Sequence, residues 1–115
     1  MNIFEEKRKK ALIQLLIDQY ALDADRDDAA MDLGEEFDDD SVLDALIQVA
    51  NNPDEIDMIS SSCGEAIGKI WARRSCFDED KYRALPAIPR YGAYVVIKSK
   101  KPEWIQKYQL EQGKF

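Results

Sequence analysis

The stretch that decides the fold is DEIDMISSSCGEAIGKIWARR, residues 54–74. Its apolar side chains recur mostly at steps of three and four, the spacing that places them on one face of an α-helix; they are Ile56, Ile59, Cys63, Ile67, Ile70 and Trp71. Gly64 and Gly68 lie four residues apart on the same helix. Since a missing side chain lets a neighbouring helix approach, we expect a close helix crossing there. Cys63, on the apolar face, is expected to be a small core residue.

Helical spacing also appears on both sides of this stretch. Residues 3–22 carry Leu12, Leu15, Leu16 and Tyr20 on one face, and shorter helices are predicted at 41–51, 78–85, 88–101 and just after Pro102. Asn52 and Pro53 suit the cap and the first position of the helix over 54–74. No two apolar alternating runs are available to pair as strands, so the sequence predicts one all-α domain.

From residue 41 onward the predicted helices form two antiparallel pairs, 41–51 with 54–74 and 78–85 with 88–101. In each pair a short helix is followed by a turn that contains proline and then by a longer helix. This layout is typical of helical hairpins stacked in a HEAT-like arrangement, in which each pair buries its remaining face against the next. We expect about five to seven helices in all.

The connecting segment between the first two long helices, residues 23–40, reads DADRDDAAMDLGEEFDDD. One residue, Arg26, is basic, and ten are acidic: Asp23, Asp25, Asp27, Asp28, Asp32, Glu35, Glu36, Asp38, Asp39 and Asp40. The segment therefore carries a net charge of −9, against −7 for the whole chain of 115 residues, so the remainder is net positive by two. Within the segment, DDAAMDL can form a short helix that Gly34 closes.

Three interpretations of this segment compete. As a calcium loop it begins well, with Asp23, Asp25 and Asp27 at positions one, three and five, but Asp28 replaces the glycine of position six and Gly34 the glutamate of position twelve. As a solvated linker it concentrates like charges within a Debye length of about 8 Å, where they repel one another. As a docking surface, it steers and anchors a basic partner. We favour the docking surface and nominate all ten acidic residues as partner-binding.

Composition disfavours several other functions. The chain has no histidine and two cysteines, Cys63 and Cys76, so a zinc site or a histidine-assisted nucleophile is not expected. No glycine-rich phosphate loop is present. Overall acidity without a basic stripe argues against direct binding to nucleic acid or to an anionic membrane. We therefore expect a non-enzymatic cytoplasmic protein with no cofactor or metal, monomeric when free.

Two stretches carry a resemblance to a known type of protein: VLDALIQVANNPDEIDMISSSCGEAIGKIWARR, residues 42–74, and AYVVIKSKKPEWIQ, residues 93–106. The chain resembles the small, acidic, HEAT-like immunity proteins of bacterial toxin–immunity systems, such as contact-dependent growth inhibition. The resemblance covers roughly residues 41–106. It implies a cytoplasmic antitoxin that binds a cognate toxin domain, often a basic nuclease, and occludes its active site. A helical scaffold that binds other proteins is the alternative, and a calcium-binding module is a weaker one.

Overall fold

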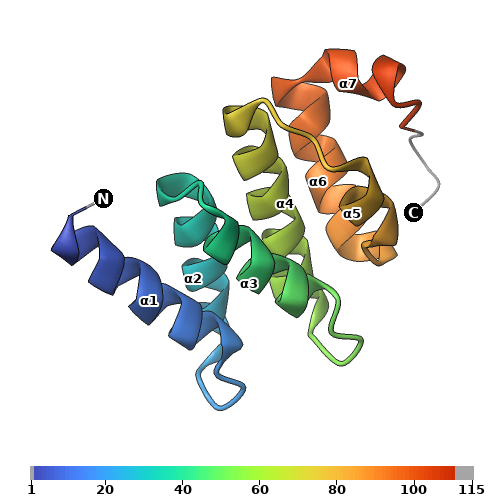
Figure 1. Cartoon of the computed structure of the whole chain (residues 1–115). Helices are drawn as coiled ribbons and strands as arrows, with labels where there is room; N and C mark the ends of the chain where they lie inside the picture. Colours follow the sequence, from blue (N-terminus) through green and yellow to red (C-terminus); the bar gives the residue numbers. More distant parts are fainter. Residues whose placement is uncertain (1, 111–115) are drawn as a thin grey trace.

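The computed structural model describes residues 2–110, and in this range helices are the only regular secondary structure (Figure 1). The seven helices are α1 (Ile3–Ile17), α2 (Asp23–Glu36), α3 (Asp40–Ala50), α4 (Asp57–Arg74), α5 (Glu79–Ala84), α6 (Ala87–Lys100) and α7 (Pro102–Lys107). The prediction of an all-α protein with five to seven helices is therefore confirmed. Among the described residues, no helix has the length and apolar character needed to cross a membrane.

The helices form two layers of successive antiparallel hairpins, α1 with α2, α3 with α4, and α5 with α6. Helices α2, α4 and α6 run side by side in one direction, while α1 and α3 pack on them from the other side (Figure 1). The described residues extend over 39 × 32 × 20 Å. The shortest dimension corresponds to two layers of helices at the usual interaxial distance of about 8–10 Å plus their side chains. The HEAT-like stacking of hairpins thus starts one hairpin earlier than the sequence predicts.

Most of the acidic segment forms the helix α2, Asp23–Glu36, which is longer than the short helix that the sequence predicts over DDAAMDL, so only residues 37–39 are a connection. Ala29, Ala30 and Leu33 are fully buried, and Phe37 just beyond the helix is 5% exposed. These residues recur at helical spacing, so they give α2 a narrow apolar face despite its many aspartates. Gly34 does not end the helix. It lies inside α2, and a Cβ placed there would be 2.6 Å from the Cβ of Ala66 on α4.

Two predicted helix boundaries are also wrong. Helix α1 ends at Ile17 and not near residue 22, because Asp18 leaves the helical conformation and its carboxylate accepts a hydrogen bond from the backbone N–H of Tyr20. Tyr20, expected on the apolar face, is 98% exposed. Helix α4 begins at Asp57, since Asn52 uses its side chain to accept from the N–H of Asp54 in a separate turn.

Helix α4 is the centre of the molecule, and its predicted apolar face is largely confirmed. Ile59, Cys63, Ile67, Ile70 and Trp71 are buried. Ile56 is the exception: it precedes the helix as its N-cap residue and is 40% exposed.

The close helix crossing predicted from the two glycines of α4 is confirmed. A Cβ built on Gly64 would lie 2.0 Å from the carbonyl oxygen of Pro89, and one on Gly68 would lie 3.0 Å from that of Ala93, both on α6. The backbones of α4 and α6 therefore touch.

An aromatic cluster closes the far end of the stack. The ring of Phe77, between α4 and α5, lies with its centroid 5.4 Å from those of Trp71 and Tyr82, 5.2 Å from Trp104 and 4.8 Å from Tyr108. Trp71, Tyr82 and Trp104 are all buried. Aromatic rings at such separations contribute packing energy beyond the area that they bury, so α5 and α7 are attached to the stack mainly by this cluster.

Replacing Gly64 with alanine tests the α4–α6 crossing. Alanine is normally favoured over glycine within a helix by about 1 kcal/mol, but here its methyl group would overlap the backbone of Pro89. We expect Gly64→Ala to lower the free energy of unfolding by about 1–3 kcal/mol, as overpacking does, measured by urea denaturation. Ser62→Ala, half-buried on the same helix, is the matched control and should stay within about 0.5 kcal/mol of the parent. A Gly64→Ala protein as stable as the control would contradict the crossing.

Candidate functional site

The side chains of α2 divide into a buried apolar set and an exposed acidic set. Ala29, Ala30 and Leu33 face the interior, and Asp23, Asp25 and Asp28 are exposed. Asp23 and Asp25 lie in the first turn, where negative charge is favourable to the helix dipole. Asp27 is only partly exposed, and one of its carboxylate oxygens is buried without a hydrogen-bond partner. None of these four aspartates forms an ion pair with another residue in 2–110.

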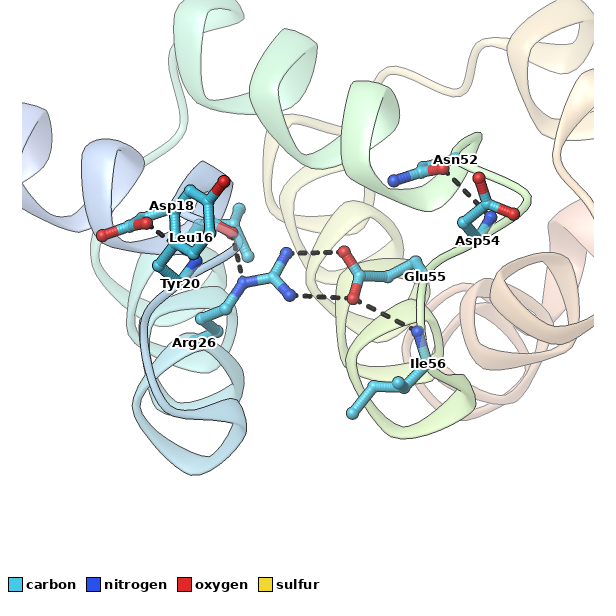
Figure 2. Close-up of polar contacts among 8 residues, drawn as sticks. All are labelled: Leu16, Asp18, Tyr20, Arg26, Asn52, Asp54, Glu55 and Ile56. Carbon is cyan, nitrogen blue, oxygen red and sulfur yellow. Dashed lines mark hydrogen bonds and ion pairs between the residues drawn. The ribbon is translucent and has the colours of Figure 1, made fainter.

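The single basic residue of the segment is a buried anchor. Arg26 is 5% exposed, and its guanidinium donates hydrogen bonds of 2.9 and 2.5 Å to the carboxylate of Glu55 (Figure 2). Its Nε donates at 2.9 Å to the backbone carbonyl of Leu16 at the end of α1. Glu55 also accepts from the N–H of Ile56. Three separate parts of the chain therefore meet at Arg26: α1, α2 and the turn between α3 and α4. Sequence reasoning counted Arg26 only as a charge that opposes its neighbours.

The second half of the acidic segment is neutralised by α1 and α4. From α1, Arg8 donates to Glu36 at 2.6 Å and to Asp32 at 3.4 Å, and Lys9 donates to Asp39 at 2.6 Å. From α4, Lys69 donates to Glu35 at 2.5 Å, Arg73 to Asp38 at 2.5 Å and Arg74 to Asp40 at 2.9 Å. These contacts offset the repulsion that makes a solvated linker unfavourable. Six of the ten nominated residues thus hold α2 and the α2–α3 turn against the rest of the molecule.

These ion pairs change how readily the carboxylates take up protons. The hydrogen bond from Lys69 lowers the pKa of Glu35, and that from Arg8 lowers the pKa of Glu36. Partial burial raises the pKa of Asp39, but the hydrogen bonds from Lys9, from its own backbone and from Ser41 together bring it below its ordinary value. Because each folded-state pKa is depressed, the stabilisation is present above the ordinary carboxyl pKa and is lost as the pH falls through the depressed value.

An open hollow of about 600 Å³ lies where α2 ends. Its wall is strongly acidic, and its lining residues are Glu5, Glu36, Phe37, Asp38, Asp39, Asp40 and Arg74. One carboxylate oxygen of Asp39 is buried without a hydrogen-bond partner, as is one of Asp27 outside this hollow. Glu5, from the first turn of α1, was not among the nominated residues. Only the three-dimensional placement of α1 reveals it. Four of its five carboxylates already pair with Arg8, Lys9, Arg73 or Arg74, and the exposed aspartates Asp23, Asp25 and Asp28 lie toward the opposite end of α2.

The geometry does not fit the calcium-loop interpretation. Asp23, Asp25 and Asp27 lie on a helix, where each two-residue step turns the side chain by about 200°, so their carboxylates cannot converge on one ion. Within residues 2–110, no group of three or more acidic or cysteine side chains is placed to hold a metal.

Cys63 is buried, which raises the pKa of its thiol to about 12, and Cys76 is exposed and not in a disulfide.

Comparison with known proteins found no match to this chain among protein-family models, curated proteins or solved structures.

Substitution at Arg26 tests whether the buried ion pair holds the acidic helix in place. Arg26→Met leaves the carboxylate of Glu55 buried and unpaired, and a broken buried pair typically costs about 3–5 kcal/mol. We expect a loss of that size in urea denaturation. Changing Glu55→Gln in the same chain removes the orphaned charge and should restore part of the stability. Arg8→Met, which removes the exposed pairs with Glu36 and Asp32, is the control and should cost no more than about 1 kcal/mol. Equal losses for Arg26→Met and Arg8→Met would refute a special role for Arg26.

Proposed function

We propose that this protein is an immunity protein that binds a cognate toxin domain and neutralises it by covering a basic active-site groove with the acidic surface of α2. The observation that carries this proposal is a set of exposed carboxylates in the first half of α2, those of Asp23, Asp25 and Asp28, which form no ion pair within residues 2–110. Asp25 and Asp28 share one side of the helix. On the side of α2 that carries Asp25 and Asp28, Asp32 and Glu36 follow at helical spacing, both paired with Arg8, and Glu36 lines the acidic hollow. The resemblance of residues 41–106 to HEAT-like immunity proteins points in the same direction.

A negative surface of this kind favours a positively charged partner in two ways. Its field accelerates diffusional encounter with a cationic protein, by orders of magnitude at low salt. Because the buried pair of Arg26 with Glu55 holds α2 in place, the carboxylates are arranged before binding, which lowers the entropy lost on association. A protein that must neutralise phosphates, such as a nuclease, carries the complementary positive groove. Blocking that groove requires no chemistry by the inhibitor.

A helical scaffold that binds another protein through α6 is the second candidate. Ile88, Tyr91 and Val95 are 40%, 48% and 43% exposed. Their spacing places them on one side of α6. Exposed apolar side chains in a row are typical of interaction surfaces. In this alternative the acidic residues of α2 serve solubility and the surface of α6 makes the contact.

A pull-down with the tagged chain from its native cells identifies the partner. We expect one basic protein domain in near-stoichiometric amount after a wash at low salt, and much less of it after a wash at high salt, because the contact is electrostatic. A partner without excess positive charge that survives the high-salt wash would support the α6 scaffold instead.

Neutralising the exposed acidic face then separates the two candidates kinetically. The variant carries Asp23→Asn, Asp25→Asn and Asp28→Asn, and its control carries Asp44→Asn, Asp54→Asn and Asp80→Asn, which remove the same charge from exposed positions elsewhere. We expect the first variant to slow association with the captured partner at low salt by about tenfold or more, and to flatten its salt dependence. Equal association rates for the variant and the control would refute the docking role of α2.

A further inference from the structure

A second hollow, of about 440 Å³, lies between the C-terminal ends of α2, α4 and α6, and its charge is opposite to that of the acidic hollow. In Figure 1 these three helices end at the same edge of the molecule. The lining residues are Glu35, Lys69, Ala72, Arg73 and Lys100. Three cations and one carboxylate line this wall, and a second carboxylate, that of Asp38, pairs with Arg73 beside it. The charge here is therefore positive by one, although the chain as a whole has a net charge of −7.

The cations of this hollow differ in how they are held. Arg73 is fixed by hydrogen bonds to the carboxylate of Asp38 and to the backbone carbonyls of Gly34 and Phe37. Lys69 donates at 2.5 Å to Glu35. Lys100 makes no hydrogen bond or ion pair with any other residue in 2–110. Arg73 is therefore fixed, Lys69 is held by an exposed carboxylate, and Lys100 can contact a ligand without first leaving a partner among residues 2–110.

The carboxylate of Glu35 shows where the fields of these cations overlap. Lys69 contacts it directly, and the charges of Arg73 and Lys100 act on it as well, so all three lower its pKa. Glu35 itself is 59% exposed in its side chain. An exposed ion pair contributes little to stability, so an anion of higher charge can replace Glu35 at Lys69 without disturbing the fold.

We propose that the hollow lined by Lys69, Arg73 and Lys100 is a binding site for a phosphate-type dianion. Lys69 and Lys100 contact its oxygens, while Arg73 contributes positive charge from a fixed position. Glu35 occupies this field in the free protein and competes with the ligand. The site does not include Asp23, Asp25 or Asp28, although Glu35 belongs to the acidic segment, and the proposal does not depend on the proposed immunity function.

Titration of the whole chain with inorganic phosphate tests this site. Proton–nitrogen correlation NMR at neutral pH and constant ionic strength should show saturable shifts of the backbone amides around Lys69, Arg73 and Lys100. Acetate, a monoanion, should bind more weakly, since the attraction scales with the charge. Shifts that do not saturate, or that acetate produces equally well, would overturn the assignment of a dianion site.

Three variants locate the ligand. Lys100→Ala should weaken phosphate binding roughly 3- to 10-fold, the loss expected for one typical hydrogen bond in water. Lys98→Ala, which removes the same charge from an exposed position on the same helix outside the hollow, should leave affinity within about twofold, because exposed charges act weakly through water. Glu35→Gln should strengthen binding, since the competing carboxylate is gone.

A general surface-charge effect predicts a different pattern from a built site. It would give equal losses for Lys98→Ala and Lys100→Ala, and that result would refute the site. Unchanged affinity in Glu35→Gln would refute competition at Lys69. The substituted side chains lie at the surface, and thermal unfolding of each variant verifies that the fold is intact.

Discussion

Contact between helix backbones on both sides of α4 is the constraint on which the other features of this structure depend. Gly64 faces the carbonyl of Pro89 on α6, and on the opposite side Gly34 of α2 faces Ala66. At such distances a helix cannot rotate without placing a side chain where no room exists. The position of Gly34 therefore decides which residues of α2 are buried, and by elimination which aspartates reach solvent. Packing of small residues determines the acidic surface.

The negative charges of α2 are compatible with folding because each half of the helix compensates for them in a different way. At the second half, basic residues from α1 and α4 reach the carboxylates, so repulsion becomes attraction between elements that are distant in the chain. In the first half, Asp23 and Asp25 benefit from the helix dipole. The buried pair of Arg26 with Glu55 is satisfied at almost every polar atom. Such a pair adds less to net stability than to the choice of one arrangement over others.

Hollows of opposite charge lie close together at the ends of the parallel helices. Asp38 lines the acidic hollow and accepts a hydrogen bond from Arg73, which lines the basic one. The wall between the hollows is therefore an ion pair anchored on the backbone of α2. A partner protein that binds at this edge contacts a negative hollow and a positive hollow at fixed positions. Such a pattern of charges influences the orientation of the bound partner more than its affinity.

The sequence by itself determined the all-α class, the buried face of α4, the burial of Cys63 and a close helix crossing at Gly64 and Gly68, because each depends on local periodicity or on a missing side chain. That the crossing partner is α6 came from the structure. The sequence predicted only a short helix over DDAAMDL and not the full length of α2, since the carboxylates of this helix conceal an apolar face only a few residues wide. Nor did it separate carboxylates that face solvent from those paired with Arg8, Lys69 or Arg73, which are 24 to 35 positions away. Only the tertiary structure decided the roles of Arg26 and Lys100 and the place of Glu5, because pairing between distant residues leaves no local pattern in the chain.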